Sequence, residues 1–240
     1  MSGHSKWAQI KRQKGVADVK KGKTFTKLAN AISIAVKQGG GIGDPSQNFR
    51  LRLTIDAAKT SNMPKENIER AIKRAMSREE GVVEEVIYEG FAPGGVSIMI
   101  EAVTDNSQRT TSIIKALFNK QGATFGQPGS VAYQFKQVGQ IVVNKNGKSF
   151  DDIFSVAVNN GAEDIEEVED QVILYTFISD MIKTKEELSK EGFEIAEAEL
   201  IRIPTVFVKI EDPDKRAKIE SFMESIEELD DVQKVYSNME

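Results

Sequence analysis

The stretch TVFVKIEDPDKRAKIESFMESIEELDDVQKVY, residues 205–236, decides the fold that we expect. Residues 205–210 and 232–236 are apolar enough for strands, and Asp212-Pro213 between them is an N-cap followed by a first-turn proline. Apolar side chains then recur at helical spacing: Ile219, Phe222, Met223, Ile226 and Leu229. A β-α-β segment this short cannot form a sheet of its own. We therefore expect it to complete a sheet that begins elsewhere in the chain.

Residues 82–127 contain the other half of that sheet. After the turn Pro93-Gly94-Gly95, every second residue from Val96 to Ala102 is apolar, which predicts a strand. Asp105 or Asn106 then caps a helix. If residues 205–240 join this segment, residues 131–204 form an inserted domain.

The inserted segment has its own pattern of elements. We expect strands at 131–135, 140–144, 163–168, 171–177 and 193–203. Two capping boxes, Ser149 with Asp152 and Thr184 with Glu187, predict the helices between them. The order β-α-β-β-α-β, which begins at 140–144, is typical of a ferredoxin-like sandwich.

In the first third of the chain, apolar residues recur at helical spacing. An amphipathic helix runs from Phe25 to Val36 and stops at the glycines 39–41. Asp44-Pro45 is expected to open a second helix, and Pro64 lies in the first turn of a third. The predicted fold is thus α+β and multidomain. Its parts are a three-helix domain (1–80), a discontinuous α+β domain (81–130 and 205–240) and an inserted ferredoxin-like domain (131–204).

The composition excludes several kinds of chemistry. The 240 residues include no cysteine and one histidine, His4, so disulfides, Cys/His zinc sites and Cys-His nucleophiles are ruled out. Gly22-Lys23-Thr24 resembles the end of a nucleotide-binding phosphate loop, but Ala17 replaces the first glycine and no strand precedes it. No apolar run could span a bilayer. We expect a cytoplasmic protein without catalytic residues, metal or cofactor.

Charge is distributed very unevenly along the chain. Residues 1–80 contain 17 Lys and Arg against 7 Asp and Glu, whereas residues 81–240 contain 15 against 30. This asymmetry indicates a basic module that binds a polyanion, attached to an acidic body. Two acidic clusters, at 163–170 and 224–231, have no apolar shielding, and we expect both to be solvated.

The predicted nucleic-acid site consists of the basic residues of the first domain and one aromatic residue. Phosphates would be held by these cations, and an arginine on a helix could read base edges in a major groove. Trp7 and Phe25 could stack on bases or staple the first helices. The candidate residues are Lys6, Trp7, Lys11, Arg12, Lys14, Lys20, Lys21, Lys23, Lys27, Arg50, Arg52, Lys65, Arg70, Lys73 and Arg74.

Five segments resemble the YebC family: GHSKWAQIK, KGKTFTKLANAISIAVKQGGG, NFRLRLTIDAAKTSNMPKENIERAIKRA, YEGFAPGGVSIMIEAVTDN and GSVAYQF. The resemblance covers nearly the whole chain. It implies an N-terminal helical domain, two α+β domains of which one is inserted in the other, and no enzyme activity. Members of the family are described as DNA-binding regulators of transcription and as ribosome-associated factors that help translation through proline-rich stretches. The family also includes a mitochondrial translational activator of a cytochrome oxidase subunit.

Three hypotheses for the function remain open. The leading one is a non-catalytic DNA-binding regulator of transcription. The alternative is a ribosome-associated translation factor that binds ribosomal RNA or tRNA and relieves stalling at proline-rich stretches. The third is a scaffold whose basic domain binds acidic proteins.

Overall fold

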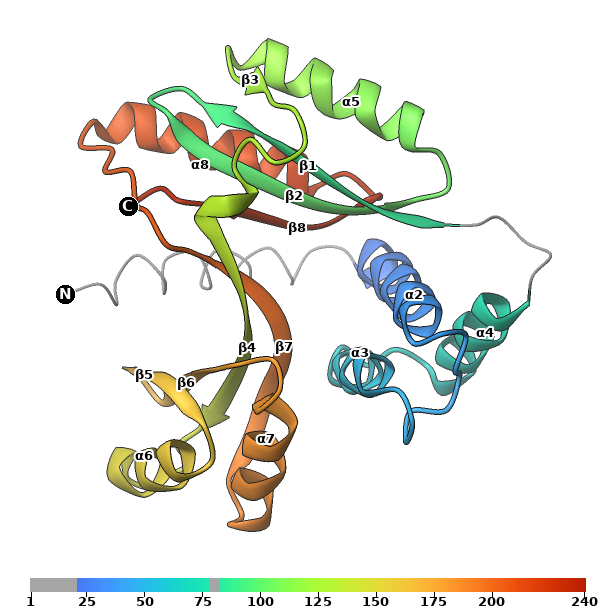
Figure 1. The fold of residues 1–240 in the computed structure, drawn as a ribbon, viewed down its shortest axis with the longest axis vertical. Coiled ribbons are helices and arrows are strands. Elements are labelled where there is room, and N and C mark those ends of the chain that lie inside the picture. Colours follow the sequence, from blue (N-terminus) through green and yellow to red (C-terminus); the bar gives the residue numbers. More distant parts are fainter. Residues whose placement is uncertain (1–20, 78–82) are drawn as a thin grey trace. The chain divides into compact units, whose positions relative to one another are not determined.

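Seven α-helices and two four-stranded sheets make up the residues that the computed structural model describes, 21–77 and 83–240 (Figure 1). This architecture confirms the predicted α+β class. The chain divides into two units: one is residues 136–203, and the other joins the described residues up to 135 with residues 204–240. In the described ranges, no helix has both the length and the apolar character needed to cross a membrane.

The first sheet combines segments from the middle and the end of the chain. Its strands are β1 (Glu84–Ala92), β2 (Val96–Thr104), β3 (Thr124–Phe125) and β8 (Val232–Ser237). Their order is β3-β1-β2-β8, and all neighbours are antiparallel. Because β8 pairs with β2, the expectation that the C-terminal segment completes this sheet is confirmed.

Helices α5 (Ser107–Lys120) and α8 (Pro213–Glu227) pack on one face of that sheet (Figure 1). Ile98 and Ile100, which are two residues apart and so lie on the same face of β2, are fully buried beneath these helices. Phe118 of α5 meets Phe222 of α8 edge to face, with ring centres 5.0 Å apart. Burial of each such side chain stabilises the fold by about 2 kcal/mol. This shared core joins the two segments of the discontinuous sheet.

Two segments predicted as strands are not strands. Residues 205–210 make only an isolated bridge, between Val208 and Met239. Residues 131–135 contain a 3-10 turn, Ala132–Gln134, and the strand β4 begins only at Phe135.

Glu89 is the physical reason for the second correction. Its carboxylate is 4% exposed and accepts hydrogen bonds from the backbone N–H groups of Gly129 (2.6 Å), Val131 (2.6 Å) and Ala132 (2.8 Å). Those N–H groups are therefore not available to a neighbouring strand. The contact joins the YEGF segment of β1 to the GSVAYQF segment, two of the motifs singled out in the sequence.

The second sheet lies in the unit of residues 136–203. Its elements are β4 (Phe135–Asn144), α6 (Phe150–Asn159), β5 (Ala162–Val168), β6 (Gln171–Thr176), α7 (Met181–Lys190) and β7 (Glu194–Pro204). The strand order β5-β6-β4-β7 places the first and third strands at the centre, as a ferredoxin-like sheet requires. This part of the fold prediction is confirmed.

The two predicted capping boxes of this unit had different outcomes. Ser149 caps α6, and its Oγ accepts from the N–H of Asp152 (3.2 Å). Thr184, in contrast, lies buried inside α7, which begins at Met181. Its hydroxyl hydrogen-bonds the carbonyl oxygens of Asn160 and Asp180. The Thr184 box was therefore wrong, because a tertiary contact uses the side chain that the pattern assigned to a cap.

The basic helices are α2 (Lys21–Gln38), α3 (Phe49–Thr60) and α4 (Lys65–Met76). Ile32, Val36, Leu51 and Ala58 form the centre of their core. The predicted glycine stop after α2 is confirmed. Gly40 and Gly41 have φ values of 73° and 83°, which suit glycine and end the helix.

Asn48, and not Asp44-Pro45, begins α3. Its side-chain oxygen accepts from the Leu51 N–H, while its Nδ2 donates to the carbonyl oxygens of Ala35 (2.8 Å) and Ile42 (3.1 Å). One buried amide thus joins the end of α2, the glycine loop and the start of α3. Asp44 instead accepts from the Ser46 N–H in the preceding turn, and this bond lowers the pKa of its carboxyl group.

Candidate nucleic-acid interface

The predicted site residues fall into three groups in the structure. Six lie outside the described residues: Lys6, Trp7, Lys11, Arg12, Lys14 and Lys20. Lys21 and Lys23 belong to the first turn of α2. The remaining cations lie on α2, α3 and α4, where their surroundings differ.

Three of these cations donate hydrogen bonds to other groups of the protein. Lys27 Nζ donates to the carbonyl oxygen of Glu227 at 2.6 Å. Arg52 donates to the carbonyl oxygens of Pro45 (3.0 Å) and Ser46 (3.1 Å), and so secures the turn before α3. Arg50 donates to Gln38 Oε1 at 2.8 Å and lies 5.9 Å from the ring centre of Phe49. These contacts reduce the freedom of all three side chains to rearrange around a ligand.

Helix α4 has the most exposed group of predicted cations. Lys65, Arg70, Lys73 and Arg74 are all exposed, whereas Ile68 and Ala71 are buried against α2 and α3. Lys65 forms an ion pair with Glu69 at 3.5 Å, but its side chain is 89% exposed, so the pair is weak. The solvent face of α4 can therefore meet a polyanion at little cost in desolvation.

A groove of about 320 Å³ lies between α2 and α4. Arg70 and Arg74, one helical turn apart, line its α4 side together with Asn67. Asn30 lines the α2 side, and Phe25 and Met63 provide apolar surface. The groove was not predicted, because it arises from the packing of two helices. Its two arginines were among the candidate residues, and Phe25 had been considered for base stacking.

The side chains of this interface have the chemistry to bind a polyanion. Guanidinium groups hold phosphates through several N–H donors, and amides can donate and accept at base edges. Within residues 21–77 and 83–240, no three potential metal ligands lie close enough to hold a metal ion. The described interface thus consists of an exposed cationic helix with a polar groove beside it.

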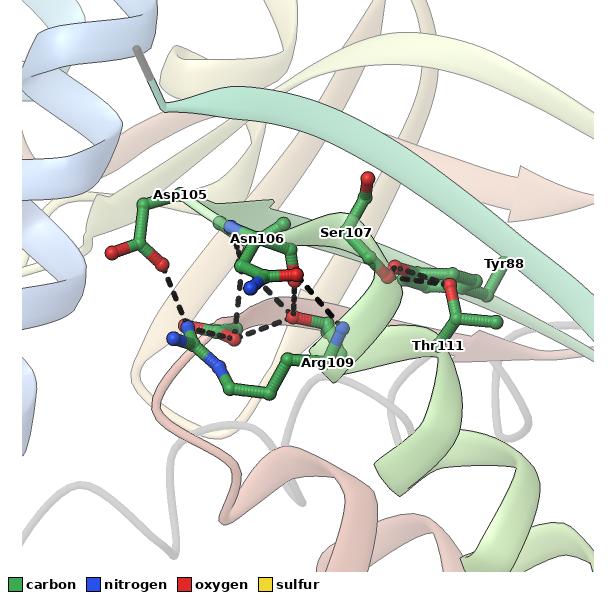
Figure 2. Close-up of polar contacts among 9 residues, drawn as sticks. Tyr88, Asp105, Asn106, Ser107, Arg109 and Thr111 are labelled. Carbon is green, nitrogen blue, oxygen red and sulfur yellow. Dashed lines mark hydrogen bonds and ion pairs between the residues drawn. The ribbon is translucent and has the colours of Figure 1, made fainter. Parts of the chain in front are cut away.

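A second polar cluster, at the start of α5, holds the fold together (Figure 2). Asp231, just before β8, accepts hydrogen bonds from Thr110 (2.6 Å), Thr104 (3.2 Å) and Arg109 (3.2 Å). Arg109 also pairs with Asp105 at 2.7 Å. The cluster fastens β2 and α5 to the C-terminal segment. The expectation that all the acids near the end of α8 are solvated was therefore wrong for Asp231.

The surroundings of this cluster shift the pKa values of Arg109 and Tyr88. Hydrogen bonds to Asp231 and Asp105 raise the pKa of Arg109, which keeps its guanidinium charged. Tyr88 lies beside the cluster: Thr111 donates to its hydroxyl at 3.2 Å (Figure 2). Burial raises the pKa of Tyr88, the bond from Thr111 opposes this shift, and the nearby carboxylates of Asp231 and Glu84 add to it.

Comparison with known proteins places this architecture in a family of regulators. Residues 5–78 match the model of the TACO1/YebC N-terminal domain, and residues 83–239 match that of the TACO1/YebC second and third domains. The chain belongs to the TACO1/YebC family, which confirms the resemblance seen in the sequence.

Curated relatives and a solved structure extend this comparison. Proteins named "Probable transcriptional regulatory protein" from Persephonella marina and from a Sulfurihydrogenibium species are 46% and 47% identical to this chain. Both alignments cover 100% of this chain and 96% of the relative. The crystal structure of a conserved hypothetical protein from Aquifex aeolicus aligns with a TM-score of 0.88 at 42% identity, covering 98% of this chain and 96% of that one.

Proposed function

We propose that this protein is a non-catalytic regulator of gene expression that binds nucleic acid through its helical domain, residues 1–80. The observation that carries the proposal is the exposed face of α4, where Lys65, Arg70, Lys73 and Arg74 lie together. A row of cations on a rigid helix neutralises phosphates and displaces their counterions. The acidic domains, 81–130 with 205–240 and 131–204, would be the body to which this basic module is attached, and the protein would act in the cytoplasm.

Promoter DNA is the first candidate for the partner. The names of the relatives, which call them transcriptional regulatory proteins, support it. The exposed arginines of α4 also have the chemistry to read guanine edges in a major groove. A transcriptional regulator of this kind should prefer its promoter at least about a thousandfold over random duplex at physiological salt.

Ribosomal RNA or tRNA is the second candidate, and the groove beside α4 favours it. Proteins read duplex DNA mainly with elements that project into its grooves. A hollow between helices instead suits bases that are not paired, which are abundant in folded RNA. In this case the protein would act as a translation factor on the ribosome, and it would relieve stalling at proline-rich stretches.

One binding experiment tests the shared part of the proposal. We expect the full chain to bind labelled RNA or DNA with an affinity that falls steeply as salt is raised. Replacing Arg70, Lys73 and Arg74 with Gln should reduce the salt slope on duplex DNA by about 3, or by about 2 on a single strand. A matched control replaces three exposed lysines of other helices, Lys183, Lys190 and Lys218, and carries the same change in charge.

The outcomes separate the alternatives. An equal loss in the α4 variant and the control would show that only net charge matters, which contradicts a site on α4. A thousandfold preference for a promoter supports the first candidate. Co-sedimentation with ribosomes that the α4 variant loses supports the second. A protein that binds neither DNA nor RNA at low salt would overturn the proposal.

A further inference from the structure

The groove between α2 and α4 has a definite size and position. Its volume of about 320 Å³ is at the lower end of the range for small-molecule sites. It can therefore admit a group the size of one nucleotide, but not a base pair that remains stacked in a duplex. All its lining residues lie between Phe25 and Arg74, so the helical domain alone forms it.

The lining is chemically suited to a nucleotide. Asn67, Arg70 and Arg74 are spaced by one helical turn on the same face of α4, and Asn30 faces the groove from α2. Phe25 and Met63 provide an apolar surface on which a base can rest. Phosphate, base edge and base face would each meet a group of matching chemistry.

Several of these polar groups are available for a ligand. Within the described parts of the chain, the side chains of Asn30, Asn67 and Arg70 have no hydrogen-bond or ion-pair partner. Asn30 and Asn67 are half-buried, so water reaches them less freely than it reaches groups on an open surface. In this respect they differ from Asn48, whose amide oxygen and nitrogen are both used within the fold.

We propose that this groove holds one unpaired nucleotide of a single strand. The phosphate lies against Arg70 and Arg74, the base rests on Phe25 and Met63, and the amides of Asn30 and Asn67 bond the base edges. This inference rests on the proposed nucleic-acid function and narrows its substrate class to strands with at least one unpaired base. RNA and DNA strands share this chemistry, and the experiment distinguishes them.

The test compares three short labelled oligonucleotides on the full chain: an RNA strand, a DNA strand of the same sequence, and the duplex. Asn30→Trp fills the groove and Asn67→Ala removes one amide, and neither changes the charge. Asn119→Trp is the matched control, because Asn119 is an exposed asparagine on α5, outside the groove. Circular dichroism confirms that each variant is folded, and a fluorescent adenine analogue in the strand reports base stacking.

We expect Asn30→Trp to weaken single-strand binding at least about fivefold, the loss that follows when one stacked base is excluded. The salt slope and duplex affinity should stay as in the wild type, and the signal of the adenine analogue should be lost. Asn67→Ala should weaken single-strand binding in the same direction, and the control should change nothing. Whichever strand shows the larger loss, RNA or DNA, is the partner.

Three results would overturn the inference. If both groove variants bind single strands as the wild type does, the groove holds no nucleotide, although the proposed function survives. If they lose duplex and single-strand binding equally, the groove does not distinguish unpaired bases. If polyglutamate competes as well as RNA at equal charge, the occupant is an acidic peptide. A wild-type chain that binds no nucleic acid would refute the proposed function itself.

Discussion

Replacing Glu89 with Gln would test whether one buried carboxylate holds the 129–132 segment. The side chain keeps its size but loses its charge. Its single amide oxygen can still accept from Val131 and Ala132, which share one carboxylate oxygen in the structure. The new NH2 group then faces the N–H of Gly129, which bonded the other oxygen at 2.6 Å.

The magnitude follows from these three bonds. A hydrogen bond to a charged group contributes about 1.5 to 3 kcal/mol and a neutral one about 1 kcal/mol. One bond is lost and two become neutral, while the buried side chain no longer bears the cost of desolvating a charge. We expect a net destabilisation of about 2 to 4 kcal/mol.

Urea unfolding followed by circular dichroism gives the overall change in stability. Because a chain of several domains need not unfold in one step, hydrogen exchange at the amides of Val131 and Ala132 provides the local measurement. Glu84→Gln, at the exposed start of the same strand, is the control and should change stability by less than about 0.5 kcal/mol. If Glu89→Gln unfolds with the control and the two amides exchange at wild-type rates, our account of this segment is refuted.

Two further predictions concern the cluster around Asp231. Asp231→Ala leaves the buried hydroxyls of Thr104 and Thr110 without their carboxylate partner. We expect the free energy of unfolding, measured with heat or urea, to fall by about 2 to 4 kcal/mol. A fall no larger than that caused by Asp230→Ala, at an exposed position, would contradict the proposed role of Asp231. The raised pKa of Tyr88 predicts a contribution to stability that is complete below the unfolded tyrosine pKa of about 10 and disappears as pH rises through the folded value. Melting temperatures across this alkaline range should fall more steeply for the wild type than for Tyr88→Phe, and parallel curves would exclude this contribution.

Much of the fold could be predicted because hydrophobic period and capping residues are local signals. The helical stripe of α8, its cap Asp212 and the alternation along β2 all carried such signals. The short C-terminal segment then required a partner sheet, and β8 pairs with β2. The strand order of the inserted unit followed from the order of its elements.

Two of the errors have a similar physical cause: a hydrogen bond with a distant segment uses a group that the local pattern had assigned to a strand or a cap. Glu89 accepts from the N–H groups of Val131 and Ala132, and Thr184 donates to the carbonyl oxygen of Asn160, the C-cap residue of α6. The error at α3 is local, because Asn48, four residues after Asp44, caps the helix instead. The cationic face of α4 was visible in the sequence, but the groove beside it depends on how α2 and α4 pack, and no local pattern contains that information.

The pairing of β2 with β8 has a consequence for synthesis of the protein. Strand β2 is complete by residue 104, but the strand that covers its free edge begins at residue 232, near the end of the chain. At about 5 to 20 residues per second, the ribosome needs on the order of ten seconds to make the residues between them. Throughout that interval an apolar strand with one open edge is exposed to other nascent chains. The open edge of β2 is therefore covered only after the six residues of β8, Val232–Ser237, have been synthesised.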